Sequence, residues 1–158
     1  MAHMFLRALF FILWLLLTPA ASFAESTGHL FLRVESVEQK KVLLDLPIQP
    51  GDLFYFQYIH SSAKTPIRDT FKVDAQGQII LIEETFLWHG AGLEFQEHED
   101  VQVNYNDKWI RVLLNRLFLN LPIRVGRVSQ QYLILHGQSY RLDKLDRPGK
   151  CIILSIAR

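Results

Sequence analysis

The sequence has very little cysteine and almost no excess of charge. A single Cys, at position 151, stands among 158 residues, so no disulfide can form within the chain and a hydrophobic core has to stabilise the fold. Because Cys151 opens an apolar run, we expect a buried and unreactive thiol. Lys and Arg number 17 against 16 Asp and Glu, a formal net charge of +1. This balance excludes the strongly basic surface of a nucleic-acid-binding or general polyanion-binding protein.

Long apolar runs are lacking after the first 24 residues, which have the pattern of an export signal. Arg7 precedes the apolar run 8–17, and a proline and small residues lead up to Ala24. We expect residues 1–24 to be a secretory signal peptide cleaved after Ala24. The apolar run is about half of the roughly 20 residues that a membrane-spanning helix needs, so an uncleaved membrane anchor is the weaker alternative. No cysteine lies near this point to carry a lipid.

The remaining residues, 25–158, have the composition of one folded domain. The whole chain is 49% hydrophobic and 21% charged, which excludes a disordered protein. It contains no internal repeat, low-complexity tract or linker. We therefore expect a single domain that lies outside the cytoplasm.

Alternation of apolar and polar residues with period two dominates this domain and predicts strands. The expected strands cover residues 29–35, 41–46, 52–59, 67–73, 78–87, 101–105, 109–114, 123–128, 132–135 and 151–156. About ten short strands at this spacing predict an all-β fold, a single-domain antiparallel β-sandwich or barrel. Residues 52–59 are rich in aromatic side chains and are predicted as a central strand, and residues 74–77 as a hairpin turn. The leucines of residues 111–121 also fit helical spacing, so one short helix there is the alternative.

An unusual polar segment covers residues 58–69, where an aromatic strand ends in a loop and the chain enters the next strand. His60, Ser61 and Thr65 offer hydrogen-bond donors and acceptors there, and Asp69 is placed to orient His60 or a ligand amine. The alternative is structural, with the hydroxyl groups bonded to the backbone of their own loop.

Hydrolysis and metal binding have weaker support in the sequence. A hydrolase would combine Ser61 or Thr65 with a histidine and Asp69, but adjacent His60 and Ser61 point to opposite faces of an extended strand, and no Gly-x-Ser-x-Gly motif is present. No histidine after residue 24 stands two or four positions from another. We therefore expect no metal site and no cofactor.

Two further features permit more than one interpretation. Gly90 and Gly92 can adopt positive φ or approach a ligand closely, but they lack the spacing of a phosphate-binding loop, and a wide turn or bulge explains them. Arg124 lies in a strand-like run. If it faces inward it suits a carboxylate ligand, whereas a solvated edge strand explains it without any ligand.

The sequence resembles the bacterial domain of unknown function 1850 family in three segments. They are Tyr58-x-His60-Ser61 with Thr65-Pro66-x-x-Asp69-x-Phe71, then Glu84-x-Phe86 leading to Gly90-Ala91-Gly92-Leu93, and Arg124-Val125-Gly126. The resemblance implies a small periplasmic protein, often encoded beside tripartite ATP-independent periplasmic (TRAP) transporters of the TAXI type, which import small organic acids. It implies no established enzyme activity.

The leading hypothesis is therefore an accessory protein of solute uptake. It would bind a transporter component, either the TAXI solute-binding protein or the TRAP membrane subunit, or hold a small organic anion. The residues assigned to ligand or partner binding are Tyr58, His60, Ser61, Thr65, Asp69 and Arg124, with Arg124 as the partner of the anion. A periplasmic hydrolase is the second hypothesis. The third is an envelope assembly protein in which the aromatic face of residues 54–58 simply packs the core.

Overall fold

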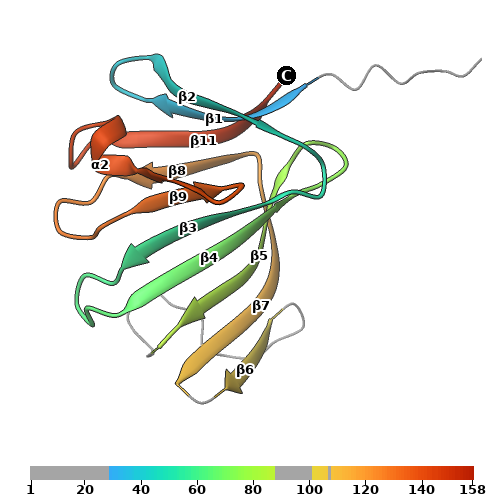
Figure 1. Ribbon diagram of the computed structural model, residues 1–158, viewed down its shortest axis with the longest axis vertical. Helices are drawn as coiled ribbons and strands as arrows, with labels where there is room; N and C mark the ends of the chain where they lie inside the picture. The colour runs from blue at the N-terminus through green and yellow to red at the C-terminus, as the bar shows by residue number, and fades with distance from the viewer. Residues whose placement is uncertain (1–28, 88–100, 107) are drawn as a thin grey trace, which may run out of the picture.

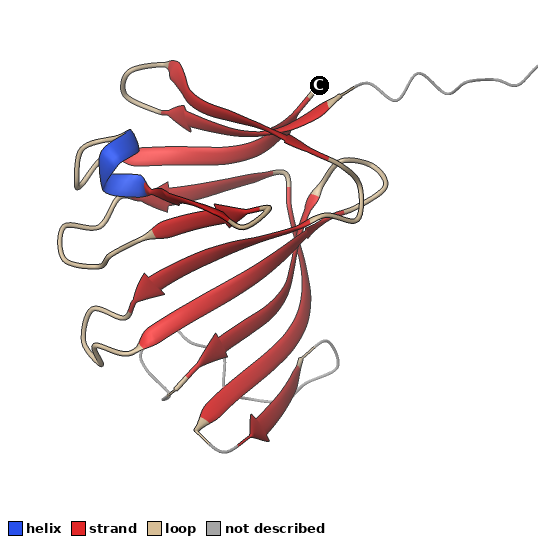
Figure 2. Cartoon of the chain, in the orientation of Figure 1, coloured by secondary structure: helices blue, strands red, loops and turns tan. Residues whose placement is uncertain are grey.

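The computed structural model describes residues 29–87, 101–106 and 108–158, which form eleven strands and one four-residue helix (Figure 2). Their bounds are β1 Leu30–Ser36, β2 Lys41–Ile48, β3 Leu53–Ile59, β4 Pro66–Val73, β5 Ile79–Phe86, β6 Gln102–Asn106, β7 Trp109–Phe118, β8 Asn120–Arg124, β9 Tyr132–Leu135, β10 Gln138–Arg141, α2 Leu142–Leu145 and β11 Cys151–Ala157. The predicted signal peptide, residues 1–24, and the turn glycines Gly90 and Gly92 lie outside the described residues.

The strands form two antiparallel sheets (Figure 1). One has four strands in the order β2-β1-β11-β8, and the other has seven in the order β10-β9-β3-β4-β5-β7-β6. Over the described residues each sheet runs from one free edge to another. The all-β prediction is therefore confirmed, and of its two forms the structure is a sandwich with no closed barrel.

Both sheets bury one face in a single hydrophobic cluster. In the four-stranded sheet, Leu32 and Val34 of β1 alternate with half-buried neighbours and are fully buried. In the seven-stranded sheet, Phe54 of β3 stacks on Phe71 of β4 with 5.0 Å between ring centroids. Burial of such apolar side chains is what stabilises a sandwich without disulfides.

The central strand and the hairpin of the sequence-based prediction are confirmed. β3 lies between β4 and β9 in the sheet. The turn between β4 and β5 is held by Asp74, whose Oδ1 accepts the backbone N–H groups of Gln76 and Gln78 at 2.9 and 2.7 Å. Gly77 completes this turn with φ of +76°, a conformation that favours glycine.

The alternative of a helix over residues 111–121 is wrong, because these residues belong to β7 and β8. Ile110, Val112 and Leu114 are buried, while Arg111 and Leu113 are exposed, so burial follows the two-residue period of a strand. The helical spacing of the leucines is fortuitous, since Leu113 and Leu117 face solvent.

Three further expectations need correction. The strand predicted for residues 123–128 begins earlier and ends at Arg124, because the chain turns at Gly126, whose N–H donates to Gln131 Oε1 at 2.7 Å. The pair β10 and α2 was not predicted. Cys151 is half-buried rather than buried.

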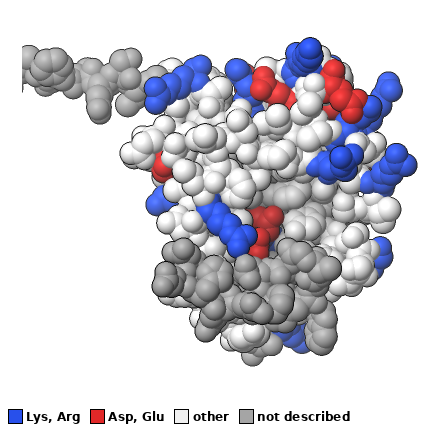
Figure 3. Space-filling view, turned by 180° about the vertical axis from the view of Figure 1, so that it is seen from behind, with Lys and Arg blue, Asp and Glu red and all other residues white. Residues whose placement is uncertain are grey.

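Charged side chains of both signs lie close together on the surface. On the face in Figure 3, Lys and Arg alternate with Asp and Glu near the top of the molecule, and further acidic atoms lie near the middle. Arg33 forms a two-bond pair with Asp45, each bond 2.8 Å long. No helix among the described residues has the length and apolar character that crossing a membrane would require.

Candidate functional site

Two carboxyl groups face each other on the apolar side of the seven-stranded sheet. Asp69 of β4 lies directly opposite Glu84 of β5 in the antiparallel register. The same row of paired residues continues to Phe56 of β3 on one side and to Val112 of β7 on the other, and both are buried. Because residues paired across strands share a face, Asp69 and Glu84 stand in an otherwise hydrophobic row.

The electrostatics of this pair follow from its burial. Loss of solvent raises the pKa of Asp69 to about 8, and the neighbouring Glu84 carboxylate adds to the effect. Burial likewise raises the pKa of the Tyr58 phenol, with smaller contributions from Asp69 and Glu84. At neutral pH, Asp69 is therefore a protonated carboxyl group that can both donate and accept a hydrogen bond.

Two polar atoms in this region are buried without a partner. Among the described residues, neither Asp69 Oδ1 nor Thr65 Oγ1 has a hydrogen-bond partner. Buried polar atoms in native proteins are nearly always bonded, and leaving one unbonded destabilises the fold. We define Tyr58, Thr65, Asp69 and Glu84 as the acidic cluster. Asp69 Oδ1 and Thr65 Oγ1 are the atoms of this cluster to which a ligand could add a hydrogen bond.

His60 has a different role from that cluster, because its ring closes the loop between β3 and β4. Its Nδ1 accepts the N–H of Ala63 at 3.2 Å and lies 3.1 Å from Ser62 Oγ. Its backbone N–H donates to Thr65 O at 2.8 Å, and its carbonyl accepts the N–H of Lys64 at 2.9 Å. Ser62 is thus the serine whose hydroxyl reaches His60, whereas Ser61 is exposed.

Arg124 is placed in the other sheet. It ends β8, the edge strand of the four-stranded sheet, and its exposed guanidinium donates to Gly149 O at 3.1 Å. Its carbonyl accepts a bond of 3.2 Å from Gln131 Nε2. The contacts of Arg124 are therefore those of a solvated edge strand that holds the turn before β11.

Of the residues assigned from the sequence, the structure brings Tyr58, Thr65 and Asp69 to one end of the seven-stranded sheet. The residue that sequence reasoning missed is Glu84. Glu84 stands in the second of the three family-like segments. The strand pattern of residues 78–87 does not tell whether Glu83 or Glu84 lies on the buried face. Within residues 29–87, 101–106 and 108–158, no three metal-binding side chains come close enough to hold an ion.

Comparison with known proteins gives one finding. The sequence model of a family described as Domain of unknown function (DUF1850) matches residues 54–142, a range that contains the whole acidic cluster. No curated protein and no solved structure matches the chain.

Proposed function

This chain belongs to the DUF1850 family, and on that premise we propose that it is a periplasmic accessory protein of solute uptake, linked to a TAXI-type TRAP transporter, that binds a small organic acid. The ligand is held at the acidic cluster. The observation that carries the proposal is the pairing of Asp69 with Glu84 on the core face of the sheet.

The loss of folding stability caused by burying these two carboxyl groups supports a binding role. Carboxyl groups on the core face lower the stability of a sandwich, because burial disfavours their charged forms and like charges repel. Among the described residues, no Lys or Arg forms an ion pair with Asp69. A ligand that donates a hydrogen bond to Asp69 Oδ1 would supply the missing interaction, so binding and stability would be coupled.

The chemistry of the acidic cluster also narrows the ligand. Asp69 and Glu84 can accept hydrogen bonds from an ammonium or hydroxyl group, and the negative charge of Glu84, which raises the pKa of Asp69, repels a bare carboxylate. We therefore infer an organic acid that carries an amine or hydroxyl group beside its carboxylate. In this proposal the donor group of the ligand lies against Asp69 and Glu84, and Arg124 takes no part.

The hydrolase hypothesis has less support. Its base would be His60, whose Nδ1 is engaged with the Ala63 N–H and Ser62, and one of its candidate nucleophiles, Ser61, is exposed on the loop. A histidine that positions its own loop is not oriented toward a nucleophile through that nitrogen.

The test is a thermal-shift measurement with three matched solutes, glutamate, 2-hydroxyglutarate and glutarate. They share a carbon skeleton and differ in carrying an ammonium group, a hydroxyl group or neither. We expect the first two to raise the melting temperature with dose, because a ligand that binds only the native state stabilises it, and glutarate to have no effect. Shorter matched sets, alanine, lactate and propionate, extend the comparison.

Three variants locate the site. Asp69→Asn and Glu84→Gln should abolish the shift, whereas Glu83→Gln should keep it, because Glu83 faces Arg111 on the opposite side of the same strand. A folded protein that none of these solutes stabilises, or a shift that survives both cluster variants, would contradict the proposal. Mild crosslinking of the exported protein to the solute-binding protein or the membrane subunit tests the link to the transporter.

A further inference from the structure

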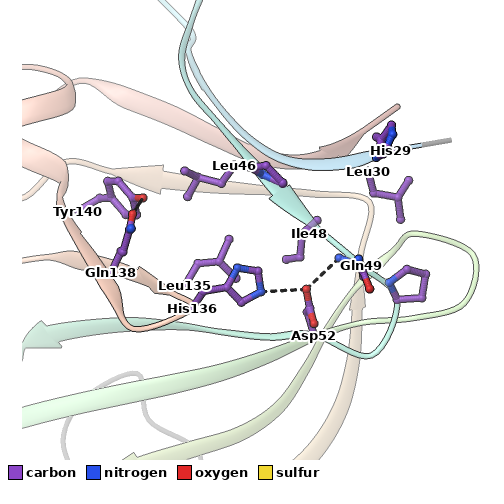
Figure 4. A pocket seen from close by; sticks show the side chains of 12 residues that line it. His29, Leu30, Leu46, Ile48, Gln49, Asp52, Leu135, His136, Gln138 and Tyr140 are labelled. Carbon is purple, nitrogen blue, oxygen red and sulfur yellow. Dashed lines mark hydrogen bonds and ion pairs between the residues drawn. The ribbon is translucent and has the colours of Figure 1, made fainter. Parts of the chain in front are cut away.

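A hollow lies at the end of β3 away from the acidic cluster, between the free edges of the two sheets (Figure 4). It has a volume of about 730 Å³, within the usual range for small-molecule sites. Its apolar wall is made by Leu30 of β1, Leu46 and Ile48 of β2, and Leu135 of β9. Two of these, Ile48 and Leu135, belong to the buried core, so the hollow opens directly onto the interior of the sandwich.

The polar rim of the hollow centres on His136. Its backbone has a φ of +49°, in the left-handed region, and its Nε2 donates to Asp52 Oδ2 at 3.0 Å. The same oxygen accepts the backbone N–H of Gln49 at 2.9 Å. Figure 4 shows this arrangement beside the apolar side chains. The carboxylate of Asp52 is therefore already bonded to two donors and holds the ring in one orientation.

The next strand completes the rim with donors. Tyr140 O–H donates to Gln138 Oε1 across 2.5 Å, which occupies the acceptor atom of this amide. The Gln138 NH2 group is then left to donate to a ligand, and the second ring nitrogen of His136 donates as well in the imidazolium form, since in the neutral ring that nitrogen only accepts. Since the rim's one carboxylate is engaged, the hollow suits a head group that accepts hydrogen bonds rather than an ammonium group.

We propose that this hollow binds a medium-chain fatty acid, with its carboxylate on His136 and Gln138 and its alkyl chain against Leu30, Leu46, Ile48 and Leu135. The inference goes beyond the function proposed above and uses separate residues. Asp52 and Tyr58 stand at opposite ends of β3, about 20 Å apart at the rise of an extended strand. Binding here would place an apolar chain where the two sheets fail to meet.

Calorimetric titration with four probes tests the ligand class: octanoate, decanoate, octanol and octylamine. We expect octanoate to bind and decanoate to bind about tenfold tighter, because each buried methylene adds roughly a three- to fourfold gain. Octanol and octylamine should bind at least tenfold more weakly. Equal binding of octylamine and octanoate, or the absence of octanoate binding by the folded protein, would overturn the proposal.

Substitutions locate the site independently of the ligand class. Leu46→Trp should fill the hollow and abolish octanoate binding, whereas Val42→Trp, on the exposed part of the same strand, should leave it intact. His136→Asn keeps a residue that tolerates the left-handed backbone and should weaken binding about tenfold through loss of the hydrogen bond between the ring and the head group. Octanoate binding that survives Leu46→Trp, or that is lost in Asp69→Asn, would show that the hollow is not the site.

Discussion

Asp69 and Glu84 are direct cross-strand partners on the buried face of a sheet, an arrangement in which two like charges oppose each other. The two carboxyl groups do not easily ionise at the same time in that position, and the pKa of Asp69 rises to about 8. The acidic cluster consequently links stability to pH through one pair of side chains, and under the proposed function it would link both to ligand binding.

The first prediction concerns the pH dependence of stability. Between pH 4 and pH 8, roughly, folded Asp69 keeps a proton that it has released in the unfolded chain, where its pKa is near the usual 3.8. The free energy of unfolding should therefore fall as pH rises through this window and level off above it. In Asp69→Asn this contribution is absent, so the loss between pH 5 and pH 9 should be smaller by about 4 kcal/mol. Urea unfolding at the two pH values measures the difference.

The matched control is Asp45→Asn. The ion pair with Arg33 holds the pKa of Asp45 below its usual value, so its stabilisation is present above pH 4, roughly, and is lost only in acid. This variant should keep the wild-type slope between pH 5 and pH 9. A slope unchanged in Asp69→Asn would show that Asp69 is ionised in the folded protein.

The second prediction concerns the contribution of His60 to closing the loop between β3 and β4. An asparagine can place its Oδ1 where Nδ1 accepts the N–H of Ala63, whereas leucine cannot. We expect His60→Leu to cost about 1–2 kcal/mol of unfolding free energy and His60→Asn to cost less than half of that. Denaturant unfolding of the two variants provides the measurement, and equal losses would mean that the Nδ1 contacts do not stabilise the loop.

The third prediction concerns the buried contact between Ser36 and Asp146. Ser36 Oγ donates to Asp146 Oδ2 at 2.6 Å and, with the N–H of Arg147 and the amide of Gln39, lowers the pKa of Asp146. Asp146→Ala should destabilise the protein by about 2 kcal/mol at pH 7, because the Ser36 hydroxyl loses its acceptor. The lowered pKa means that this stabilisation is present above pH 4, roughly, and is lost as the pH falls further.

Unfolding of Asp146→Ala at pH 7 and pH 3 gives the test for this contact. Asp143→Ala, which removes an exposed ion pair between the short helix α2 and Arg141 at the end of β10, should change stability much less. If Asp146→Ala destabilises equally at both pH values, its charged form is not what holds Ser36.

The fourth prediction concerns the turn after β8. A Cβ added at Gly126 would lie 1.9 Å from Ser129 Oγ and 3.2 Å from Ser129 O, so the turn would have to shift. Gly126→Ala should cost about 1 kcal/mol. Combining it with Ser129→Ala removes the closest contact and should recover part of the loss, as measured by the midpoints of thermal unfolding. A double variant no more stable than Gly126→Ala would place the strain elsewhere.

Much of the fold could be predicted because strand periodicity is local. The alternation around residues 52–59 and 132–135 gave strands within one residue of β3 and β9. The leucines near Leu117 fitted both a strand and a helix, because the preference of leucine for either structure does not tell which side of the element faces solvent. The early end of β8 depends on the space around Gly126, which only the folded turn defines.

The site was predictable in part for a related reason. Asp69 stands in regular alternation with Ile67, so a buried orientation follows from the sequence. The buried orientation of Glu84 does not follow from the sequence. The pairing of β5 with β7 shifts between Leu81 and Glu83, and this shift exchanges the faces of the strand. Ile79 and Leu81 are buried before it, and Phe86 is buried after it. The register shift therefore decides whether Glu83 or Glu84 faces the core, and no local sequence pattern predicts this shift.

The pairing of β1 with β11 has a consequence for the order in which the molecule is assembled. Phe31 pairs with Ala157 and Ser36 with Ile152, so the first strand described lies hydrogen-bonded to the last. β1 and β2 can form a hairpin early, but the centre of their sheet stays vacant until β11 joins it. Contacts of such sequence separation form late. We therefore expect the four-stranded layer to close late, and a chain that lacks β11 would leave β1 and β8 without their common partner.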